Sequence, residues 1–279
     1  VNSGYRGCAG TVWLSQQKRN NLTLGGSGNI QTLRLGTADD MGPFTSTNYV
    51  FGNVMIETNG LLEIDGNQFK NVVNAVANGL ASLIQIGTLE VKNGGRISAD
   101  GFGFGGGRGP GAATGHVDGG SHGGRGGLWA GIGPTYGSVT NPTALGSGGS
   151  SGFSSAGGAI LITSTNTLTV NGTISAGGLD RGSGGSVNIV AKELVGSGVI
   201  RANGGTYTGD IYGNGGGGRV AVRLTTGTDF GGVTNMAIGG TNGVKGAAGT
   251  VYLKHAGQST GAGFVWVNNA LATTTNSLT

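Results

Sequence analysis

The stretch Gly184-Gly185-Ser186-Val187-Asn188-Ile189 recurs along the chain with the same plan, two small residues followed by alternating positions. Three further copies are Gly157–Ile162 (GGAILI), Gly217–Val222 (GGRVAV) and Ala248–Leu253 (AGTVYL). In chain order, the four copies begin 27, 33 and 31 residues apart. Apolar residues that alternate with polar or small ones are typical of a half-buried strand. Equivalent positions of the copies should therefore stack into one inward column, made of Ile160, Val187, Val220 and Val251.

A second strand-like piece follows the first, as in Leu168–Gly178 (LTVNGTISAGG) and Leu194–Gly205 (LVGSGVIRANGG). Leu89–Gly101 is an earlier copy, and Met236–Gly240 is a weaker one. Two strands in every ~30 residues are too few to bury a core alone, whereas stacked units bury one between them. The repeats predict an all-β protein, a right-handed parallel β-helix (β-solenoid), with Ile174 and Ile200 in a second inward column.

Glycine is the most unusual feature of the composition. It supplies 65 of 279 residues, roughly three times the ordinary share of ~7%. Charged residues make up 10% and prolines number four, which excludes an ordinary helical enzyme and, without a three-residue glycine period, collagen. We expect glycine at turns and close backbone approaches, and glycine-rich loop excursions over residues 101–158 and 204–218.

The two ends of the chain carry the same motif. Gly4–Leu14 (GYRGCAGTVWL) matches Gly243–Leu253 (GVKGAAGTVYL) at seven of eleven positions without a gap. Residues 1–40 and 240–279 are therefore interpreted as equivalent end segments of a single β-solenoid domain spanning 1–279. The open ends of such a stack can join head to tail, and heterologous contacts of this kind generate filaments.

The region from residue 20 to 90 keeps the strand chemistry with less glycine. Asn53–Thr58 (NVMIET) and Leu61–Asp65 (LLEID) alternate as strands do. Residues 67–81 can be interpreted as a short helix, but Asn71, Asn74, Asn78 and Gly79 are poor helix formers, so a strand continuation is preferred.

The unit Leu-x-Val-x-Gly-x-Ile-x-Ala-x-Gly-Gly, with Gly-Gly-Ser/Arg-Val after it, resembles the glycine-rich repeats of large bacterial surface and extracellular matrix proteins. The resemblance covers roughly residues 85–267 and 4–14, and it extends more distantly to haemagglutinin-like adhesins. It implies a parallel β-helix and an extracellular or cell-surface location. The function of that family is undefined, so the resemblance assigns no catalytic residue.

The charge and the cysteine content limit the kinds of binding partner and cross-link that we expect. The formal net charge is +4, and the basic residues are scattered singly rather than gathered in a tract that would bind nucleic acid. A single cysteine, Cys8, excludes a disulfide framework within the chain. No segment reaches ~18 consecutive apolar residues, so no membrane-spanning helix is expected.

Candidate chemistry is sparse, and no catalytic site is predicted. Asp39 and Asp40 form the only adjacent acidic pair, and neighbours on a strand point to opposite faces. His116, Asp118 and His122 are weak candidates for a Zn²⁺ or Cu²⁺ site, weighed against solvated residues of a glycine-rich loop.

No cofactor is expected, although an isolated Ca²⁺ stays possible. Gly177–Asp180 and Gly204–Asp210 only approximate the calcium-binding β-roll repeat, so a series of calcium sites is not predicted.

Aromatic residues gather near both ends of the sequence: Tyr5, Trp13, Tyr252 and Trp266. They are interpreted as an assembly interface, the alternative being a platform on which carbohydrate rings stack.

Three functional hypotheses follow. The first is a non-enzymatic structural subunit of an extracellular bacterial fibre or biofilm matrix, which self-assembles head to tail. The second is a stalk or carbohydrate-binding segment of a large surface adhesin, with polysaccharide as the partner. The third is a polysaccharide-active enzyme, which would require clustered carboxylates in a groove.

Overall fold

The computed structural model describes residues 20–26, 28–36, 48–66, 81–127, 131–150, 152, 154–209 and 211–269. The named elements of these residues are all strands. The first eight are β1 (Asn21–Leu24), β2 (Gln31–Gly36), β3 (Asn48–Ile56), β4 (Gly60–Asp65), β5 (Ser82–Val91), β6 (Arg96–Ser98), β7 (Ala159–Ser164) and β8 (Thr167–Val170). The others are β9 (Thr173–Ser175), β10 (Ser186–Ala191), β11 (Glu193–Val195), β12 (Val199–Arg201), β13 (Arg219–Leu224), β14 (Thr234–Met236), β15 (Thr250–Lys254) and β16 (Phe264–Trp266).

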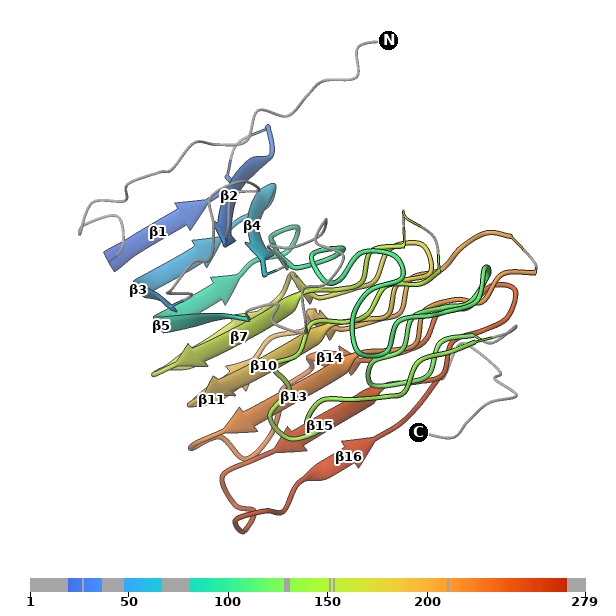
Figure 1. Cartoon of the computed structure of the whole chain (residues 1–279). Coiled ribbons are helices and arrows are strands. Elements are labelled where there is room, and N and C mark those ends of the chain that lie inside the picture. Colours follow the sequence, from blue (N-terminus) through green and yellow to red (C-terminus); the bar gives the residue numbers. More distant parts are fainter. Residues whose placement is uncertain are drawn as a thin grey trace.

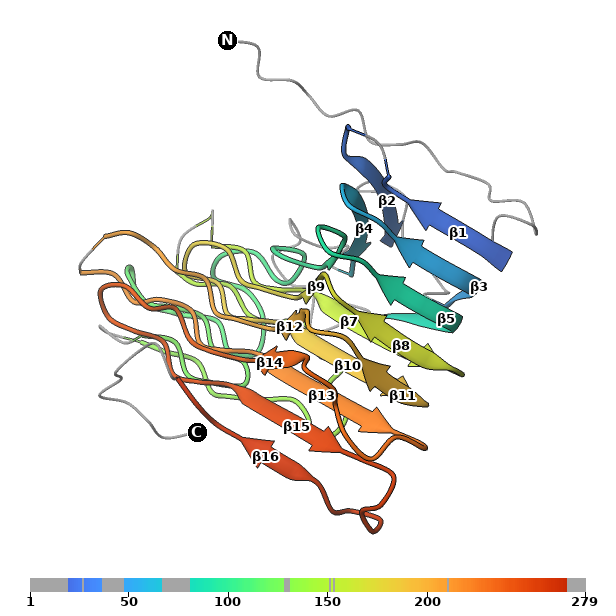
Figure 2. The ribbon, with the colours of Figure 1, turned by 180° about the vertical axis from the view of Figure 1, so that it is seen from behind.

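The strands form two sheets. A ten-stranded sheet runs in the order β1-β3-β5-β7-β10-β13-β15-β16, with β8 and β11 paired beside this path (Figure 1). A six-stranded sheet runs in the order β14-β12-β9-β6-β4-β2 and is best seen from behind (Figure 2). From β1 to β15 the chain returns to each sheet in turn, so most neighbouring strands are about 30 residues apart, whereas β5 and β7 pair across the glycine-rich stretch, with Ser82 opposite Ile160.

The register of the ten-stranded sheet confirms the first inward column. Ile160 pairs with Val187, Val187 with Val220, and Val220 with Val251, all in parallel. The first three of these side chains are fully buried and Val251 is nearly so. Burying large aliphatic side chains supplies about 1.5–3 kcal/mol each, so this column forms a main part of the core.

The six-stranded sheet has an equivalent column. Ile174 pairs with Ile200, as predicted, and the column continues to Ile97 and Leu62 on one side. Leu33 of β2 stands at one end of it, and Asn235 of β14 stands at the other. The inward column of this sheet therefore ends on a polar side chain.

The glycine-rich segments form a further hydrogen-bonded layer beside the two sheets. Their ribbons run side by side in Figure 1, although they come from distant parts of the sequence. Gly216 donates to the Gly120 carbonyl at 2.9 Å, and Gly184 donates to Gly216 at 2.9 Å. Gly124 donates to Gly217 at 2.7 Å. These backbones satisfy one another's hydrogen-bonding groups as strands do.

Close backbone approach explains why glycine directly precedes β10, β13 and β15. A Cβ on Gly218 would lie 2.1 Å from the carbonyl oxygen of Gly185, and one on Gly249 would lie 1.8 Å from that of Gly218. Neither glycine has a positive φ, so the requirement at these positions is space rather than a left-handed backbone.

The structure corrects the predicted fold class. A right-handed parallel β-helix with glycine-rich loop excursions is wrong, because the described residues form two separate sheets and the larger one is mixed: β16 runs antiparallel to β15. The glycine-rich stretch within residues 101–158 also does not form loops that project from the fold. Much of it is buried and bonded to other glycine-rich segments, because backbones without Cβ atoms can pack directly on one another.

The less glycine-rich region between residues 20 and 90 contains β-strands, as expected. β3 and β4 contain most of the two alternating stretches identified in the sequence, and β5 with β6 contains the copy that begins at Leu89. The choice between helix and strand falls largely outside the described residues, since 67–80 are not among them.

Candidate functional site

The end of the molecule formed by β14, β15 and β16 exposes an apolar surface. β16 lies antiparallel on β15, with Val251 opposite Trp266 and Leu253 opposite Phe264. Four consecutive side chains from this strand and the residue after it are about half exposed: Phe264 (51%), Val265 (50%), Trp266 (56%) and Val267 (47%). A run of exposed apolar residues on the last strand of a sheet is typical of an interaction surface.

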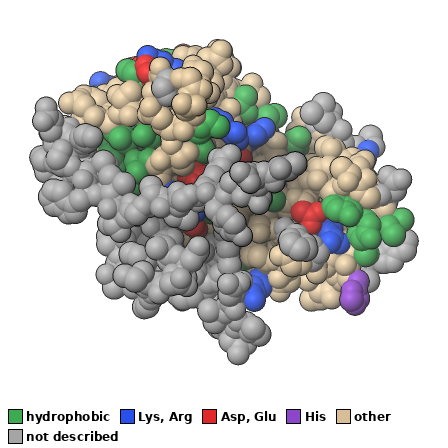
Figure 3. Space-filling model, turned by 90° about the horizontal axis from the view of Figure 1, so that it is seen from above, with side chains coloured by type: hydrophobic (Ala, Val, Ile, Leu, Met, Phe, Trp, Pro, Cys, Tyr) green, Lys and Arg blue, Asp and Glu red, His purple; other side chains and the backbone are tan. Residues whose placement is uncertain are grey.

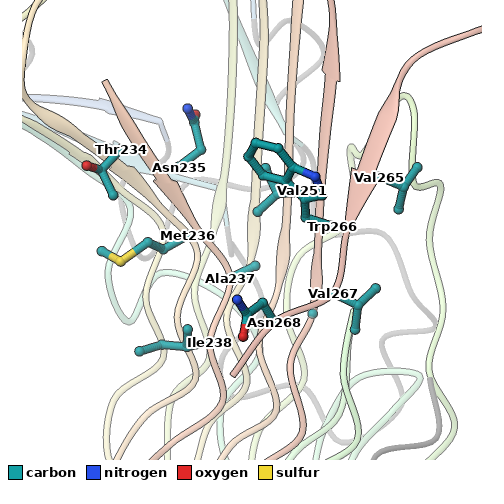
Figure 4. Close-up of a pocket in the computed structure, with 11 residues that line it drawn as sticks. Thr234, Asn235, Met236, Ala237, Ile238, Val251, Val265, Trp266, Val267 and Asn268 are labelled. Atoms are coloured by element: carbon teal, nitrogen blue, oxygen red, sulfur yellow. The ribbon is translucent and has the colours of Figure 1, made fainter. Parts of the chain in front are cut away.

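A pocket of about 670 Å³ opens beside this strand. One wall comes from the segment around β14 and the other from β16 and the residues that follow it (Figure 4). The lining residues are Thr234, Asn235, Met236, Ala237, Ile238, Gly249, Val251, Val265, Trp266, Val267 and Asn268. Val251 and Ala237 also belong to the core, so the pocket is the place where the core reaches the surface.

Asn235 brings a polar group to this apolar place. Its side-chain nitrogen donates to the carbonyl of Val233 at 3.1 Å, while its Oδ1 atom is buried without a hydrogen-bond partner. An unpaired buried acceptor costs about 1–3 kcal/mol relative to a paired one. The β14 end of the six-stranded sheet thus contains a buried polar atom without a hydrogen bond.

The four predicted interface aromatics are placed differently from one another. Trp266 lines the pocket and is exposed. Tyr252 is buried on β15, where its hydroxyl donates to the carbonyl of Ala262 at 2.8 Å and holds the hairpin between β15 and β16. Tyr5 and Trp13 lie outside the described residues.

The three weak metal candidates do not come together. His116 is exposed, whereas Asp118 is buried and accepts a hydrogen bond from the backbone of Gly131 at 2.5 Å. His122 is fully buried, with Nδ1 2.9 Å from the carbonyl oxygen of Gly184. Among the described residues, no group of three or more histidine, cysteine or acidic side chains is arranged to hold a metal ion.

The acidic candidates are also separate. Asp39 and Asp40 fall outside the described residues, as does Asp210. Asp180 accepts a hydrogen bond from the Ser154 hydroxyl at 2.7 Å and lies 3.7 Å from the Arg181 guanidinium. The Asp180 carboxylate thus lies beside a hydroxyl group and a cation.

His122 belongs instead to a buried polar network that the sequence did not indicate. Its ring lies 4.7 Å from that of Tyr136, whose hydroxyl contacts the Ser147 hydroxyl at 2.7 Å. Arg219 donates to the Tyr136 carbonyl at 2.8 Å and to the Thr250 hydroxyl at 3.0 Å. The only signal in the sequence was an arginine at a repeat position that elsewhere carries Ala, Ser or Thr.

Burial dominates the electrostatics of this network. It lowers the pKa of His122 to about 4, and the nearby Arg219 guanidinium acts in the same direction. Burial also raises the pKa of Tyr136 above its ordinary value. His122 is therefore neutral at neutral pH, and the network fastens the segment that carries Tyr136 over the start of β13.

Charges on the surface are dispersed. Lys and Arg side chains stand in small separate groups among the described residues on the face seen from above (Figure 3). Arg34 of β2 pairs with Glu63 of β4 at 2.8 Å, and Lys92 pairs with Glu57 at 3.0 Å just after the ends of β5 and β3. No helix within the described part of the chain is long and apolar enough to cross a membrane.

The chain matches no protein-family model, no curated protein and no solved structure with which it was compared.

Proposed function

We propose that the chain is a non-enzymatic structural subunit of an extracellular bacterial fibre or matrix, assembled head to tail. The observation that carries the proposal is the exposed apolar surface of β16 and Val267 beside an open pocket. Water contacts about half of each of these four side chains in the single chain. Covering them with a second copy would release that water and favour association.

The sequence supports a copy of the same chain as the partner. The motif at Gly4–Leu14 repeats that at Gly243–Leu253, so the two ends of the chain are built from related segments. Contacts between different surfaces of identical subunits do not close on themselves unless a rotation makes a ring. Repetition of such a contact gives a fibre. The extracellular location is part of this proposal and rests on the resemblance to surface-protein repeats.

Concentration-dependent assembly tests the proposal. Sedimentation velocity of the purified chain should show species that grow with concentration, and electron microscopy of the same samples should show unbranched filaments. Antibody labelling of intact cells of the source organism should place the material outside the cell. A chain that stays monomeric up to its solubility limit would contradict the structural role.

A second candidate function is a carbohydrate-binding segment of a surface adhesin. It is favoured by the exposed ring of Trp266 in a pocket that also carries Asn235 and Asn268. Aromatic faces and amides together suit the apolar and hydroxyl faces of a sugar. Glycan binding by the monomer, lost in Trp266→Ser, would favour this role over the first, which predicts association without any added ligand.

A further inference from the structure

The two sheets end unevenly at the pocket. Up to β15 the chain returns to the small sheet after each visit to the large sheet, and a visit consists of one strand or, for β7-β8 and β10-β11, of two. After β15 this alternation stops, because β16 turns back along β15 instead of pairing with β14. Among the described strands, β14 pairs only with β12, so the six-stranded sheet is one strand shorter than the pattern requires.

The pocket coincides with the place of that strand. It lies against β14 on one side and against β16 on the other, with Val251 and Ala237 of the core between them (Figure 4). A strand laid beside β14 would run at about 4.8 Å from it. Its inward side chains would enter the pocket and cover apolar groups that are open to solvent in the single chain.

The opposite end of the same sheet carries a suitable strand. β2 is the terminal strand there and pairs in parallel with β4. Leu33 is the member of the inward column on β2 and is only partly buried, while Ile30 just before the strand is 60% exposed. β2 and β14 thus belong to the two ends of one parallel ladder, and both leave apolar groups uncovered.

We propose that β2 of a second copy pairs in parallel with β14 and places Leu33 in the pocket beside Trp266. This inference rests on the proposed head-to-tail assembly and names the strands that make its joint. The six-stranded sheet then continues from one copy into the next with the same backbone pairing as inside each copy. The exposed residues of β16 meet the neighbouring β1 end of the incoming copy.

Disulfide trapping tests this pairing. If Leu33 continues the column that ends at Asn235, Thr32 comes to lie beside Thr234, and both threonines are exposed in the single chain. A variant that carries Cys8→Ser, Thr32→Cys and Thr234→Cys should form a ladder of covalent multimers on oxidation. Neighbouring strands bring Cα atoms close enough for a disulfide bond. Within one copy the two positions lie at opposite ends of the sheet.

The matched control pairs Thr32→Cys with Val195→Cys, an exposed residue of β11, and should give no ladder. A ladder from the control as strong as that from the test pair would overturn the proposal. Filaments that form without any ladder from the test pair would also overturn it, while leaving the structural role intact. Absence of assembly in the unsubstituted chain would instead contradict the structural role itself.

Substitution of the pocket provides an independent measurement. Trp266→Ser should weaken association at least tenfold in sedimentation equilibrium, because a large aromatic at the centre of a joint is a typical hot spot. Leu179→Ser removes a similarly exposed apolar side chain (51%) between β9 and β10, away from both ends of the stack, and should change association less than threefold. Equal effects of the two substitutions would contradict the pocket as the joint.

Discussion

At the scale of single residues, glycine has two separable roles in this chain. A few glycines have positive φ, for example Gly94 at the turn between β5 and β6. Those before the core strands are needed for space, since a carbonyl oxygen of the neighbouring segment occupies the position that a Cβ would take. The sequence revealed how many glycines there are, but spacing alone could not separate these roles, because the close approaches join residues about 30 positions apart.

The space requirement predicts a strong effect of one methyl group. Gly218→Ala should lower the free energy of unfolding by about 1–3 kcal/mol or more, because the added Cβ meets backbone that cannot rotate away. Chemical denaturation monitored by circular dichroism measures the change. Gly28→Ala is the control: no atom lies within 4 Å of its Cβ position, and its stability should match that of the unsubstituted chain.

His122 predicts an acid-sensitive stability. Its pKa is about 4 in the folded chain and 6.5 when unfolded, so the unfolded state binds more protons between these values. The free energy of unfolding should therefore fall as pH drops from 6.5 to 4, by up to about 3 kcal/mol. His122→Gln should flatten this part of the stability profile, whereas His116→Gln, at an exposed histidine, should leave it unchanged. A profile that is unaffected by His122→Gln would refute the burial of the ring.

At the scale of the elements, the strand pairing was largely predictable and the path of the last strand was not. Alternation and period fixed the partners of Val187 and Ile174, because equal spacing places equal residues side by side. The reversal at β16 depends on the hairpin between residues 255 and 263, which has no counterpart among the earlier strands that the structure describes. The candidate site was predicted only in part: Trp266 was identified, but the pocket needs the backbone path to bring β14 and β16 together.

The hairpin predicts a local effect of one hydroxyl. Tyr252→Phe removes the hydrogen bond to Ala262 and should lower the local stability of β16 by about 1 kcal/mol. Amide hydrogen exchange at residues 264–266 should become about fivefold faster, with little change in β10 and β13. Tyr207→Phe, in the glycine-rich layer, should leave exchange at β16 unaltered. Equal exchange in all three proteins would show that the hydroxyl does not hold the hairpin.

At the scale of the whole molecule, the motif at residues 4–14 that repeats at 243–253 predicts a contribution to assembly in addition to the pairing of β2 with β14. Deleting residues 1–14 should abolish filaments while circular dichroism and thermal unfolding show that the remaining sheets are still folded. Replacing residues 4–14 with the sequence of 243–253 should restore assembly, since the two motifs are interpreted as equivalent. Filaments that persist after the deletion would exclude a role of this segment in the joint.

The hydrogen-bonded layer of glycine-rich segments has a mechanical consequence. In both sheets the bonds between neighbouring strands point along the direction in which the strands are stacked, so tension along that direction pulls the strands apart. Bonds such as those from Gly184 to Gly216 and from Gly216 to Gly120 cross between segments of the adjacent layer. Where such bonds bridge the same gap as strand pairs, the load is shared among more bonds. A chain pulled along this direction should therefore yield at higher force than its short strands alone could bear.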